Sequence, residues 1–426
     1  MTSKKYFFIG IKGVGVVNIA TLYKEWGHEV SGSDTDEHFF TDDVLSRLSI
    51  PVVSFDPVYI TADISGVIRS SAYGDTHPQV ARALELHIPV LTYSEALAEI
   101  FNKHKGIIVT GTHGKTTSTA MLGRIFEDAG LDPTVVVGGA VVEWGKTARA
   151  GKSEWMIAEG DEYQAKILSL RPYIVLLTNI EYDHPDFYKD EEAYREVFSI
   201  LLRSLPESAY VVAHKALESF IEKETSAHVV YFQDDPTLEL ELWGVHNRVN
   251  ASGALAVARV LGVQEDVARK ALEHFRGTKR RMELYTSKDA PVVVVDDYAH
   301  HPTEIRATLS ALRAEYPDRH IVAVFQPHTY SRTQALADDF TQAFQDADEV
   351  LLLDIYGSAR ETEKLISGEQ FAARVALVHA HTRYAQSIQS TVTYCRAIVS
   401  PAVIVALGAG NVWEVARDLT IQSEAH

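Results

Sequence analysis

The run of residues 107–117 reads Ile-Ile-Val-Thr-Gly-Thr-His-Gly-Lys-Thr-Thr and constrains this chain more than any other segment. A strand-forming stretch leads into a glycine turn, which is followed by a lysine, two hydroxyl side chains and a helix expected over residues 118–128. Backbone amides in such a turn can surround an anion, the lysine can reach terminal phosphates and a hydroxyl can bind Mg²⁺. The run therefore predicts a phosphate-binding loop made of Gly111, Thr112, His113, Gly114, Lys115, Thr116 and Thr117.

The spacing of this loop is not the common one. A standard phosphate loop carries a further glycine five residues before Gly114, and this chain has Val109 there. The shorter Gly-x-x-Gly-Lys-Thr form is a variant that discriminates between families of nucleotide-binding proteins. The alternative is a tight turn between a strand and a helix, in which Lys115 stands by chance.

The composition is that of a globular protein. The chain has 426 residues, 46% of them hydrophobic and 23% charged, and no apolar stretch approaches the roughly 20 residues of a membrane-spanning helix. The net charge of −18 argues against nucleic-acid partners. The strand-like Tyr6–Ile9 argues against a secretory signal, and a single cysteine, Cys395, excludes an intrachain disulfide. We therefore expect a cytoplasmic protein that binds neither nucleic acid nor membranes.

Strand-like and helix-like segments alternate along nearly the whole chain, which predicts an α/β fold with mostly parallel sheets. Three sections separate in the sequence: residues 1–105, 106–289 and 290–426. We expect a Rossmann-like N-terminal domain, a central domain of the phosphate-loop ATPase type with a mostly parallel sheet, and a Rossmann-like C-terminal α/β domain. The stretch Thr286–Pro291 is the predicted linker before the third section.

The first section opens with a glycine-rich turn after its first strand. Gly10, Gly13 and Gly15 follow the pattern of a nucleotide-binding loop. Asp34 stands where such folds carry an acidic ribose ligand, and Lys12 takes the place of a glycine, where its charge could neutralise a diphosphate. A plain turn between strand and helix is the alternative interpretation of this motif.

Two predicted strands of the second section end in acidic clusters, at residues 158–163 and 178–186. The carboxyl ends of parallel strands are where such sheets bind ligands. Together with the hydroxyl of Thr116, Glu159 and His184 predict a mixed oxygen and nitrogen site for Mg²⁺. The other acids of these clusters are expected to cap helices or to face solvent: Glu162, Glu181 and Asp186.

Two further segments carry side chains suited to a nucleotide. The run 244–251 leads into an alanine-rich helix expected over residues 250–261. Its Asn250 can read an adenine edge, whereas Asn247 is expected to cap the helix. The run 275–283 concentrates cations in a chain that is otherwise acidic, so we expect it to meet phosphate rather than solvent.

The third section places polar runs directly after apolar strands. Residues 296–302 read Asp-Asp-Tyr-Ala-His-His-Pro, and residues 325–333 read Phe-Gln-Pro-His-Thr-Tyr-Ser-Arg-Thr. Adjacent histidines suggest zinc, but no cysteine is near and no His-x-x-x-His pair is present, so we expect no structural zinc site. Arg332 offers a planar cation for a carboxylate; the alternatives are that it caps a helix or pairs with Asp338 or Asp339 at the surface.

Taken together, these motifs resemble the ATP-dependent Mur ligases of bacterial cell-wall synthesis and, within that family, its alanine-adding branch. The resemblance covers nearly the whole chain. Its most specific segments are Gly111–Thr116 and Asp297–Pro302. The supporting segments are Gly10–Gly15, Ser31–Asp34, Ser70–Ala72, Glu159–Glu162, Thr178–His184, Gly244–Ala251, Lys279–Glu283, Phe325–Arg332 and Gly408–Gly410.

The resemblance implies a three-domain enzyme that binds a UDP-sugar in its first domain, ATP and Mg²⁺ in its second, and an amino acid in its third. The lactyl carboxylate of UDP-N-acetylmuramate would attack the γ-phosphate of ATP to give an acyl phosphate. The amine of L-alanine would then attack the activated carbonyl, and phosphate would leave. This chemistry brings two anions together, so it needs Lys115, Mg²⁺ and an arginine to neutralise the transition state.

By the same resemblance, roles fall to individual residues of this sequence. Catalytic roles are implied for Lys115, His184, Arg281 and His300. ATP is implied to bind at residues 111–117 and at Asn250, Arg281 and Asp297. The implied UDP-sugar contacts are Gly10, Lys12, Gly13, Gly15, Asp34, Ser70 and Ser71, and the implied amino-acid contacts are Tyr298, His300 and Arg332. The implied metal ligands are Thr116, Glu159 and His184, and the expected assembly is a monomer or a homodimer.

Several positions depart from the pattern of the family. Residues that differ from those of many relatives stand at Val16, Val17, Thr329 and Asn411. Ser199 stands where several sister ligases carry a carbamylated lysine, which favours the alanine-adding branch. Three other functions stay open: a ligase that reattaches recycled tripeptide to UDP-N-acetylmuramate, a nucleotide-sensing module without turnover, and a dehydrogenase, which would leave Lys115 and Thr116 unexplained.

Overall fold

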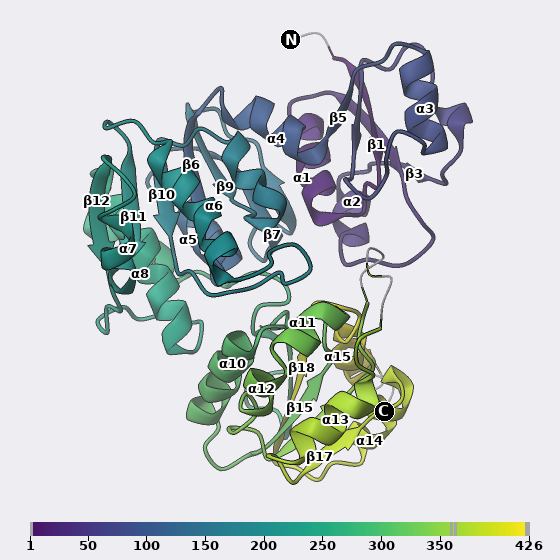
Figure 1. Ribbon diagram of the computed structural model, residues 1–426, viewed down its shortest axis with the longest axis vertical. Helices are drawn as coiled ribbons and strands as arrows, with labels where there is room; N and C mark the ends of the chain where they lie inside the picture. The colour runs from purple at the N-terminus through teal and green to yellow at the C-terminus, as the bar shows by residue number, and fades with distance from the viewer. Residues whose placement is uncertain (1–2, 358–360, 362–363, 422–426) are drawn as a thin grey trace. The chain divides into compact units, whose positions relative to one another are not determined.

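The computed structural model describes residues 3–357, 361 and 364–421. It contains three mostly parallel sheets, each flanked by helices (Figure 1). Contacts divide the chain into two compact units. The first unit comprises Met1–Ile180, Arg195–Glu239 and Asn250–Thr278, and the second comprises Glu181–Tyr194, Leu240–Val249 and Lys279–His426. The α/β class with mostly parallel sheets is confirmed, and the domain boundaries at residues 105 and 289 stay a prediction.

The first sheet is parallel throughout, with strand order β3-β2-β1-β4-β5. Its strands are β1 (Lys5–Ile9), β2 (Glu29–Ser33), β3 (Val52–Val53), β4 (Gly66–Arg69) and β5 (Val90–Thr92), and its helices are α1 (Val14–Glu25), α2 (Asp42–Arg47), α3 (Pro78–Glu85) and α4 (Tyr93–Phe101). The strand order reverses direction beside β1, and ligands of such sheets bind at the carboxyl end of the strands at this point. The glycine turn at residues 10–15 begins there.

The second sheet has the order β12-β11-β10-β6-β9-β7-β8 and is parallel except for the pairing of β7 with β8. Its strands are β6 (Lys105–Thr110), β7 (Thr134–Val141), β8 (Lys146–Arg149), β9 (Trp155–Glu159), β10 (Ile174–Leu177), β11 (Tyr210–His214) and β12 (His228–Phe232). The helices that follow in the chain are α5 (Lys115–Asp128), α6 (Glu191–Arg203), α7 (Glu218–Ile221), α8 (Val245–Val260) and α9 (Glu265–Glu273). Because β6 lies between β9 and β10, residues 111–117, 159–162 and 178–180 meet at one edge of this sheet.

The third sheet has the order β13-β14-β18-β15-β16-β17. Its strands are β13 (Glu283–Leu284), β14 (Val292–Asp297), β15 (His320–Phe325), β16 (Glu349–Leu352), β17 (Thr382–Tyr384) and β18 (Ala402–Leu407). Its helices are α10 (Pro302–Glu315), α11 (Tyr330–Ala335), α12 (Ala337–Thr341), α13 (Gly368–Ala376), α14 (Ile388–Arg396) and α15 (Trp413–Ile421). β13 pairs antiparallel with β14, so Thr286–Pro291 is a hairpin connection inside this sheet, and its interpretation as a linker is wrong.

Helices cover both faces of the third sheet, which explains why its strands are apolar without alternation. Val293 and Val295 of β14 belong to a core shared with α10, α12 and α13. Val294, between them, belongs to a second core shared with α14 and α15. A strand buried on both faces leaves only its ends exposed, and the polar residues that follow each strand are therefore available for chemistry.

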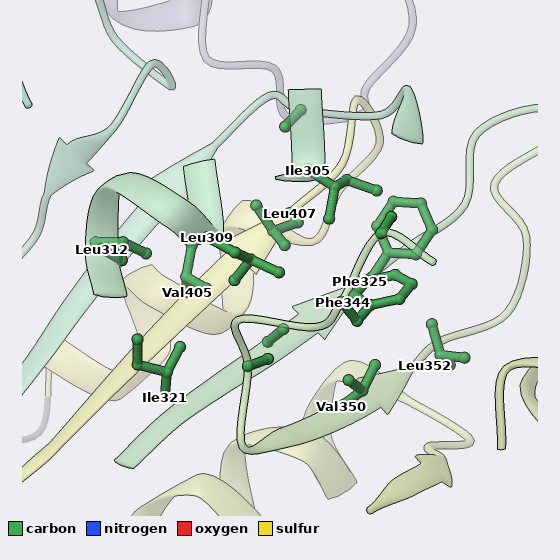
Figure 2. Packing of buried hydrophobic residues seen from close by; sticks show 14 of the residues in the cluster. Ile305, Leu309, Leu312, Ile321, Phe325, Phe344, Val350, Leu352, Val405 and Leu407 are labelled. Atoms are coloured by element: carbon green, nitrogen blue, oxygen red, sulfur yellow. The ribbon is translucent and has the colours of Figure 1, made fainter. Parts of the chain in front are cut away.

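Figure 2 shows the first of these two cores from close by. The side chains of Ile305, Leu309 and Leu312 on α10 point toward those of the neighbouring strands. Phe325 at the end of β15 is fully buried, and its ring centroid lies 5.5 Å from those of Phe340 and Phe344. This aromatic cluster anchors the strand that leads into the polar run at residues 326–333.

Two helices begin earlier than the sequence predicts. α5 begins at Lys115 rather than at residue 118, and α8 begins at Val245 rather than at residue 250. Gly114, with a φ of 79°, makes the turn into α5. Lys115 therefore lies in the first helical turn, where backbone N–H groups have no partner inside the helix and can serve an anion.

We expect Phe325→Ala to lower the free energy of unfolding by about 3–5 kcal/mol, because it removes a fully buried ring and leaves a cavity. Urea denaturation followed by circular dichroism measures this loss. Leu377→Ala, at a side chain that is 85% exposed, is the control and should change stability by less than about 0.5 kcal/mol. Equal effects of the two substitutions would contradict the placement of Phe325 in the core.

Candidate active site

The predicted phosphate loop connects β6 to α5 in the second sheet. Gly111 has a φ of 127°, a value that strains any residue with a side chain, and a Cβ atom there would lie 2.3 Å from the hydroxyl oxygen of Thr178. The N–H of His113 donates to Oδ1 of Asn179 at 2.9 Å. The end of β10 therefore fixes the curvature of the loop from one side.

The ammonium group of Lys115 lies inside this loop. Its Nζ donates to the carbonyl oxygens of Gly111 at 2.6 Å and Thr112 at 2.9 Å, and it lies 3.0 Å from Oε2 of Glu162. Burial lowers the pKa of Lys115, but the carboxylates of Glu162 and Glu159 outweigh burial and raise it above its ordinary value. Lys115 therefore carries a full positive charge at neutral pH.

Glu162 is the first correction to the sequence analysis, which expected it to cap a helix or to face solvent. Its side chain is 1% exposed, and it makes no capping hydrogen bond to the helical turn that follows it. A carboxylate buried so deeply needs a cation, and Lys115 supplies one. The sequence contains the signal only indirectly, since Glu162 lies three residues after Glu159 at the end of a central strand.

Thr116 and Glu159 lie together beside the loop, as predicted for an Mg²⁺ site. The hydroxyl of Thr116 donates to Oε1 of Glu159 at 3.1 Å, and the N–H of Gly138 donates to Oε2 at 2.7 Å. A Cβ atom on Gly138 would lie 2.4 Å from that carboxylate, so glycine is needed for this approach. Two oxygen-bearing side chains next to a phosphate loop fit the preference of Mg²⁺ for oxygen ligands.

Asn250 also lies against the loop. It is 9% exposed, and a Cβ atom on Gly114 would stand 2.2 Å from its Oδ1. Because α8 begins at Val245, Asn250 occupies the second helical turn rather than the start of the helix. Asn247 does not cap α8 as expected, because it lies inside the first turn and donates from Nδ2 to the carbonyl oxygen of Trp243 at 2.8 Å.

The glycine turn of the first sheet is closed by Asp34. Its Oδ2 accepts from the N–H of Lys12 at 2.7 Å, and its Oδ1 accepts from the N–H of Thr35 at 2.8 Å. The side chain of Lys12 is also engaged, with Nζ 2.7 Å from the carbonyl oxygen of Glu37 and 3.3 Å from Oδ1 of Asp42. Both predicted ligands therefore shape the turn, and their contacts with a UDP-sugar stay a prediction.

The other residues predicted to bind the UDP-sugar lie on the same turn or beside it. The N–H of Gly13 donates to the carbonyl oxygen of Gly10 at 3.2 Å, and Gly15 is the second residue of α1. A Cβ atom on Gly10 would lie 3.0 Å from that of Ser70, which follows β4. Ser71 comes next in the chain and is exposed.

In the second unit, Asp297 ends β14 as a buried carboxylate. Its Oδ1 accepts from the N–H of Ala299 at 2.8 Å, and its Oδ2 accepts from the N–H of Met282 at 2.9 Å. Burial raises the pKa of Asp297, and the guanidinium of Arg281 opposes this rise. These bonds hold residues 281 and 282 at the end of β14, so Asp297 and Arg281, both predicted to bind ATP, lie together.

The cations of residues 275–283 have separate roles, which corrects the expectation that the run meets phosphate as a whole. Arg280 is buried and donates from Nε to Asp296 at 3.0 Å and from Nη2 to the carbonyl oxygen of Gly408 at 2.6 Å. Lys279 pairs with Glu283. Arg281 is more exposed than Arg280, and its contact with ATP stays a prediction.

Glu304 connects Arg281 to the predicted amino-acid residues, and sequence reasoning missed it. It lies in the first turn of α10, where its Oε2 accepts from the N–H groups of His300 at 3.0 Å and His301 at 3.2 Å. Its Oε1 lies 4.0 Å from Nη1 of Arg281. The signal available in the sequence was the position of Glu304 two residues after Pro302. A proline followed closely by a glutamate is typical of the first turn of a capped helix.

Tyr298 and His300, both predicted to bind the amino acid, lie side by side after β14. Their ring centroids are 5.3 Å apart, and the ring of His328 lies 6.0 Å from that of His300. Burial lowers the pKa of His300 to about 3 and that of His328 to about 4, so both imidazoles are neutral at pH 7. The guanidinium of Arg281 stacks 5.0 Å from the ring centroid of Tyr298.

Arg332 is 3% exposed and forms a bidentate ion pair with Asp183. Its Nε and Nη2 donate to Oδ1 at 2.7 Å and Oδ2 at 3.1 Å, and its Nη1 lies 3.3 Å from Nδ1 of His328. Burial opposes the charge of Asp183, but Arg332 holds the pKa of this carboxyl well below its usual range. Surface pairing of Arg332 with Asp338 or Asp339 is wrong, because Arg332 is buried and pairs with Asp183.

His184 follows Asp183 with a φ of 57°, a left-handed conformation that is rare for residues other than glycine. Its N–H donates to Oδ1 of Asp183 at 2.7 Å, which fixes this turn. His184 belongs to the second unit, whereas Thr116 and Glu159 belong to the first. Its place in a metal site with them therefore stays a prediction.

The two other acids expected to be structural differ in their surroundings. Glu181 is partly buried, and its Oε1 accepts from the hydroxyl of Thr303 at 2.6 Å, which ties residue 181 to the start of α10. Asp186 is exposed, as expected. Neither Glu181 nor Asp186 is among the residues predicted to bind a substrate or a metal ion.

Three family models match successive parts of the chain. The model described as "Mur ligase family, catalytic domain" matches residues 5–105, "Mur ligase middle domain" matches residues 109–235, and "Mur ligase, glutamate ligase domain" matches residues 280–410. These matches follow the order of the three sheets.

Individual proteins match over almost the full length. A UDP-N-acetylmuramate--L-alanine ligase from Desulfitobacterium hafniense is 39% identical over 97% of this chain and 98% of its own length. A ligase of the same name from Aquifex aeolicus is 35% identical over 88% of this chain and 89% of its own. The crystal structure of UDP-N-acetylmuramate-alanine ligase from Thermotoga maritima covers 99% of both chains with 25% identity and a TM-score of 0.83.

These findings place the protein in the class of ATP-dependent ligases that form amide bonds and have three α/β domains. The chain belongs to the Mur ligase family. The expected family, fold and enzyme class are thereby confirmed.

We expect the thermal stability of the wild-type protein to fall more steeply with acid than that of His300→Gln. The pKa of His300 is about 3 in the folded chain and 6.5 as its ordinary value, so protonation favours unfolding. Its stabilising contribution is complete above pH 6.5 and is lost as the pH falls toward 3. Melting temperatures between pH 7.5 and pH 4.5 measure the difference.

The control for this comparison is His381→Gln at an exposed histidine, which should follow the wild-type curve. Parallel curves for the wild-type protein and His300→Gln would show that His300 is not held in its neutral form.

Proposed function

We propose that this protein joins L-alanine to the lactyl carboxylate of UDP-N-acetylmuramate and cleaves ATP to ADP and phosphate. The observation that carries the proposal is the alignment of proteins named for this reaction with 97% of the chain at up to 39% identity. The charges and hydrogen-bonding groups described above supply what each step of such a reaction needs.

In the first step, an oxygen of the lactyl carboxylate attacks the γ-phosphorus of ATP, the bond to the β-phosphate oxygen breaks, and an acyl phosphate and ADP form. Lys115 and Arg281 neutralise the negative charge of the reacting phosphate. Asn250 reads the adenine and Asp297 holds the ribose, while residues 111–117 surround the phosphates with backbone N–H groups. Charge neutralisation is the main contribution here, since carboxylate and phosphate repel each other.

Mg²⁺ fits the oxygen pair of Thr116 and Glu159, with His184 as the third proposed ligand. When bound, it would supply further positive charge at the phosphates. The hydrogen bond from the N–H of Gly138 orients the carboxylate of Glu159 beside the hydroxyl of Thr116.

In the second step, the amine of L-alanine attacks the carbonyl carbon of the acyl phosphate, loses a proton, and phosphate leaves. Tyr298, His300 and Arg332 bind the amino acid. The neutral imidazole of His300 can accept a hydrogen bond from the amine. The Arg332 guanidinium, whose Nη1 lies 3.3 Å from Nδ1 and 3.4 Å from the carbonyl oxygen of His328, would exchange these contacts for the carboxylate of the amino acid. Asp183 orients that guanidinium from the opposite edge.

The UDP-sugar binds at the glycine turn of the first domain, through Gly10, Lys12, Gly13, Gly15, Asp34, Ser70 and Ser71. Lys12 then exchanges Asp42 for the diphosphate, since both are anions at the same ammonium group. All substrates are small molecules. We infer a cytoplasmic enzyme that is a monomer or a homodimer. Among residues 3–357, 361 and 364–421, none of the helices has the length and hydropathy of a membrane span.

Phosphate release with UDP-N-acetylmuramate and a panel of acceptors tests the proposal. We expect release only when ATP, Mg²⁺, the UDP-sugar and an amino acid are all present, with L-alanine preferred over glycine and L-serine. Release with the tripeptide in place of L-alanine would identify the recycling ligase instead. Nucleotide binding without any release would identify a sensing module.

We expect Lys115→Ala to reduce phosphate release by about 100-fold to 1,000-fold, the cost of removing one charged group that stabilises a transition state. Because Lys115 is also the cation beside buried Glu162, the melting temperature should fall as well. Lys105→Ala, at an exposed lysine of β6, is the control for a lost ion pair. Release by Lys115→Ala at the wild-type rate would contradict the assignment of the loop.

We expect Arg332→Ala to lower kcat/KM for L-alanine, because the amino-acid carboxylate loses its cation. The expected decrease corresponds to a loss of about 2–4 kcal/mol of transition-state stabilisation. Acyl phosphate formation, measured as ADP release before alanine is added, should be affected less. Arg332→Ala with Asp183→Asn removes both charges and separates this effect from that of an uncompensated buried carboxylate. Unchanged half-reactions in both variants would place the amino-acid site elsewhere.

A further inference from the structure

Lys115 already uses all the hydrogen bonds that its ammonium group can donate. A lysine carries three N–H donors and no acceptor. Two of them serve the carbonyl oxygens of Gly111 and Thr112, at 2.6 Å and 2.9 Å. The third direction is taken by Glu162, whose two carboxylate oxygens lie 3.2 Å and 3.0 Å from Nζ.

A phosphate group that approaches Lys115 must therefore replace one of these three acceptors. The two carbonyl oxygens are neutral and belong to the loop that surrounds the phosphates. The carboxylate of Glu162 is an anion, so it repels an arriving phosphate and competes with it for the same charge. Of the three acceptors, Glu162 is the one that a phosphate replaces at least cost in loop geometry.

The side chain of Glu162 is 1% exposed, so water compensates little for the loss of Lys115. A buried carboxylate that gives up its nearest cation loses several kilocalories per mole of electrostatic stabilisation in general. This cost is subtracted from the affinity of the site for the phosphates of a nucleotide.

We propose that Glu162 is a counter-ion that holds Lys115 inside the loop and is displaced from it when a nucleoside diphosphate or triphosphate binds. Glu162 thereby keeps Lys115 charged and oriented, and it lowers the affinity of the loop for phosphate. The proposal rests on nucleotide binding in the proposed function, but not on the identity of the acceptor amino acid.

The test is the dissociation constant of ADP for Glu162→Gln, measured by calorimetry at one fixed Mg²⁺ concentration. Glutamine keeps the shape of the side chain and removes its charge. We expect ADP to bind about fivefold to twentyfold more tightly than to the wild-type protein. AMP, which lacks the phosphates that a loop lysine reaches, should bind both proteins equally. Glu154→Gln, at an exposed glutamate paired with Lys105, should leave both constants unchanged.

Unchanged or weaker ADP binding to Glu162→Gln would overturn the proposal, since Glu162 would then support the phosphate contact of Lys115 rather than compete with it. Equal tightening of ADP and AMP would also overturn it, because the effect would not involve Lys115. Neither measurement needs turnover, so a failure of the proposed ligase reaction is recognised separately by the absence of phosphate release.

Thermal unfolding gives a second readout that keeps the proposal testable if Glu162→Gln folds poorly. Lys115→Ala leaves the carboxylate of Glu162 without this cation, so we expect Lys115→Ala with Glu162→Gln to melt at a higher temperature than Lys115→Ala alone. A double variant that melts at the same or a lower temperature would show that the two side chains do not form the pair.

Discussion

The positive charge of Lys115 is the constraint on which the rest of the central domain depends. This charge lies in a loop whose backbone has little conformational freedom. Two glycines shape the loop, because Gly111 needs a positive φ and Gly114 leaves no space for a Cβ atom beside Asn250. The parallel order of β10, β6 and β9 then brings oxygen-bearing side chains to the same edge. This arrangement suits phosphate, since positive charge, backbone N–H groups and oxygen-bearing side chains converge at one strand end.

The second unit uses charge in another way. Arg332 and Asp183 form a buried bidentate pair, which fixes the guanidinium and leaves Nη1 beside His328. Burial keeps His300 and His328 neutral, so the polar cluster has one strong cation edge and uncharged imidazoles around it. In the proposed reaction, this cluster would bind the carboxylate of a small zwitterion, and the amine of the zwitterion must lose a proton in order to react.

Local pattern predicts the glycine turns, the parallel sheets and the strand ends well, because each depends on neighbouring residues. Local pattern does not predict contacts between side chains that are distant in the chain. Glu162 looks like a surface acid until β6 and β9 are paired, and Arg332 lies 149 positions from the carboxylate that binds it. The start of α5 at Lys115 was missed since propensity says little about a first turn that a glycine loop creates. Thr286–Pro291 resembles a linker in composition, yet β13 pairs back across it.

The central claim is that the lactyl carboxylate is activated by attack on the γ-phosphate of ATP. Transfer of oxygen from this carboxylate to the released phosphate tests the claim most directly. UDP-N-acetylmuramate labelled with ¹⁸O in both oxygens of its lactyl carboxylate is mixed with ATP, Mg²⁺ and L-alanine, and the released phosphate is analysed by mass spectrometry. If the carboxylate attacks the γ-phosphate and the amine then displaces phosphate at carbon, each phosphate carries one labelled oxygen. Phosphate without label, released at the rate of amide formation, would contradict activation of the carboxylate by the phosphate loop.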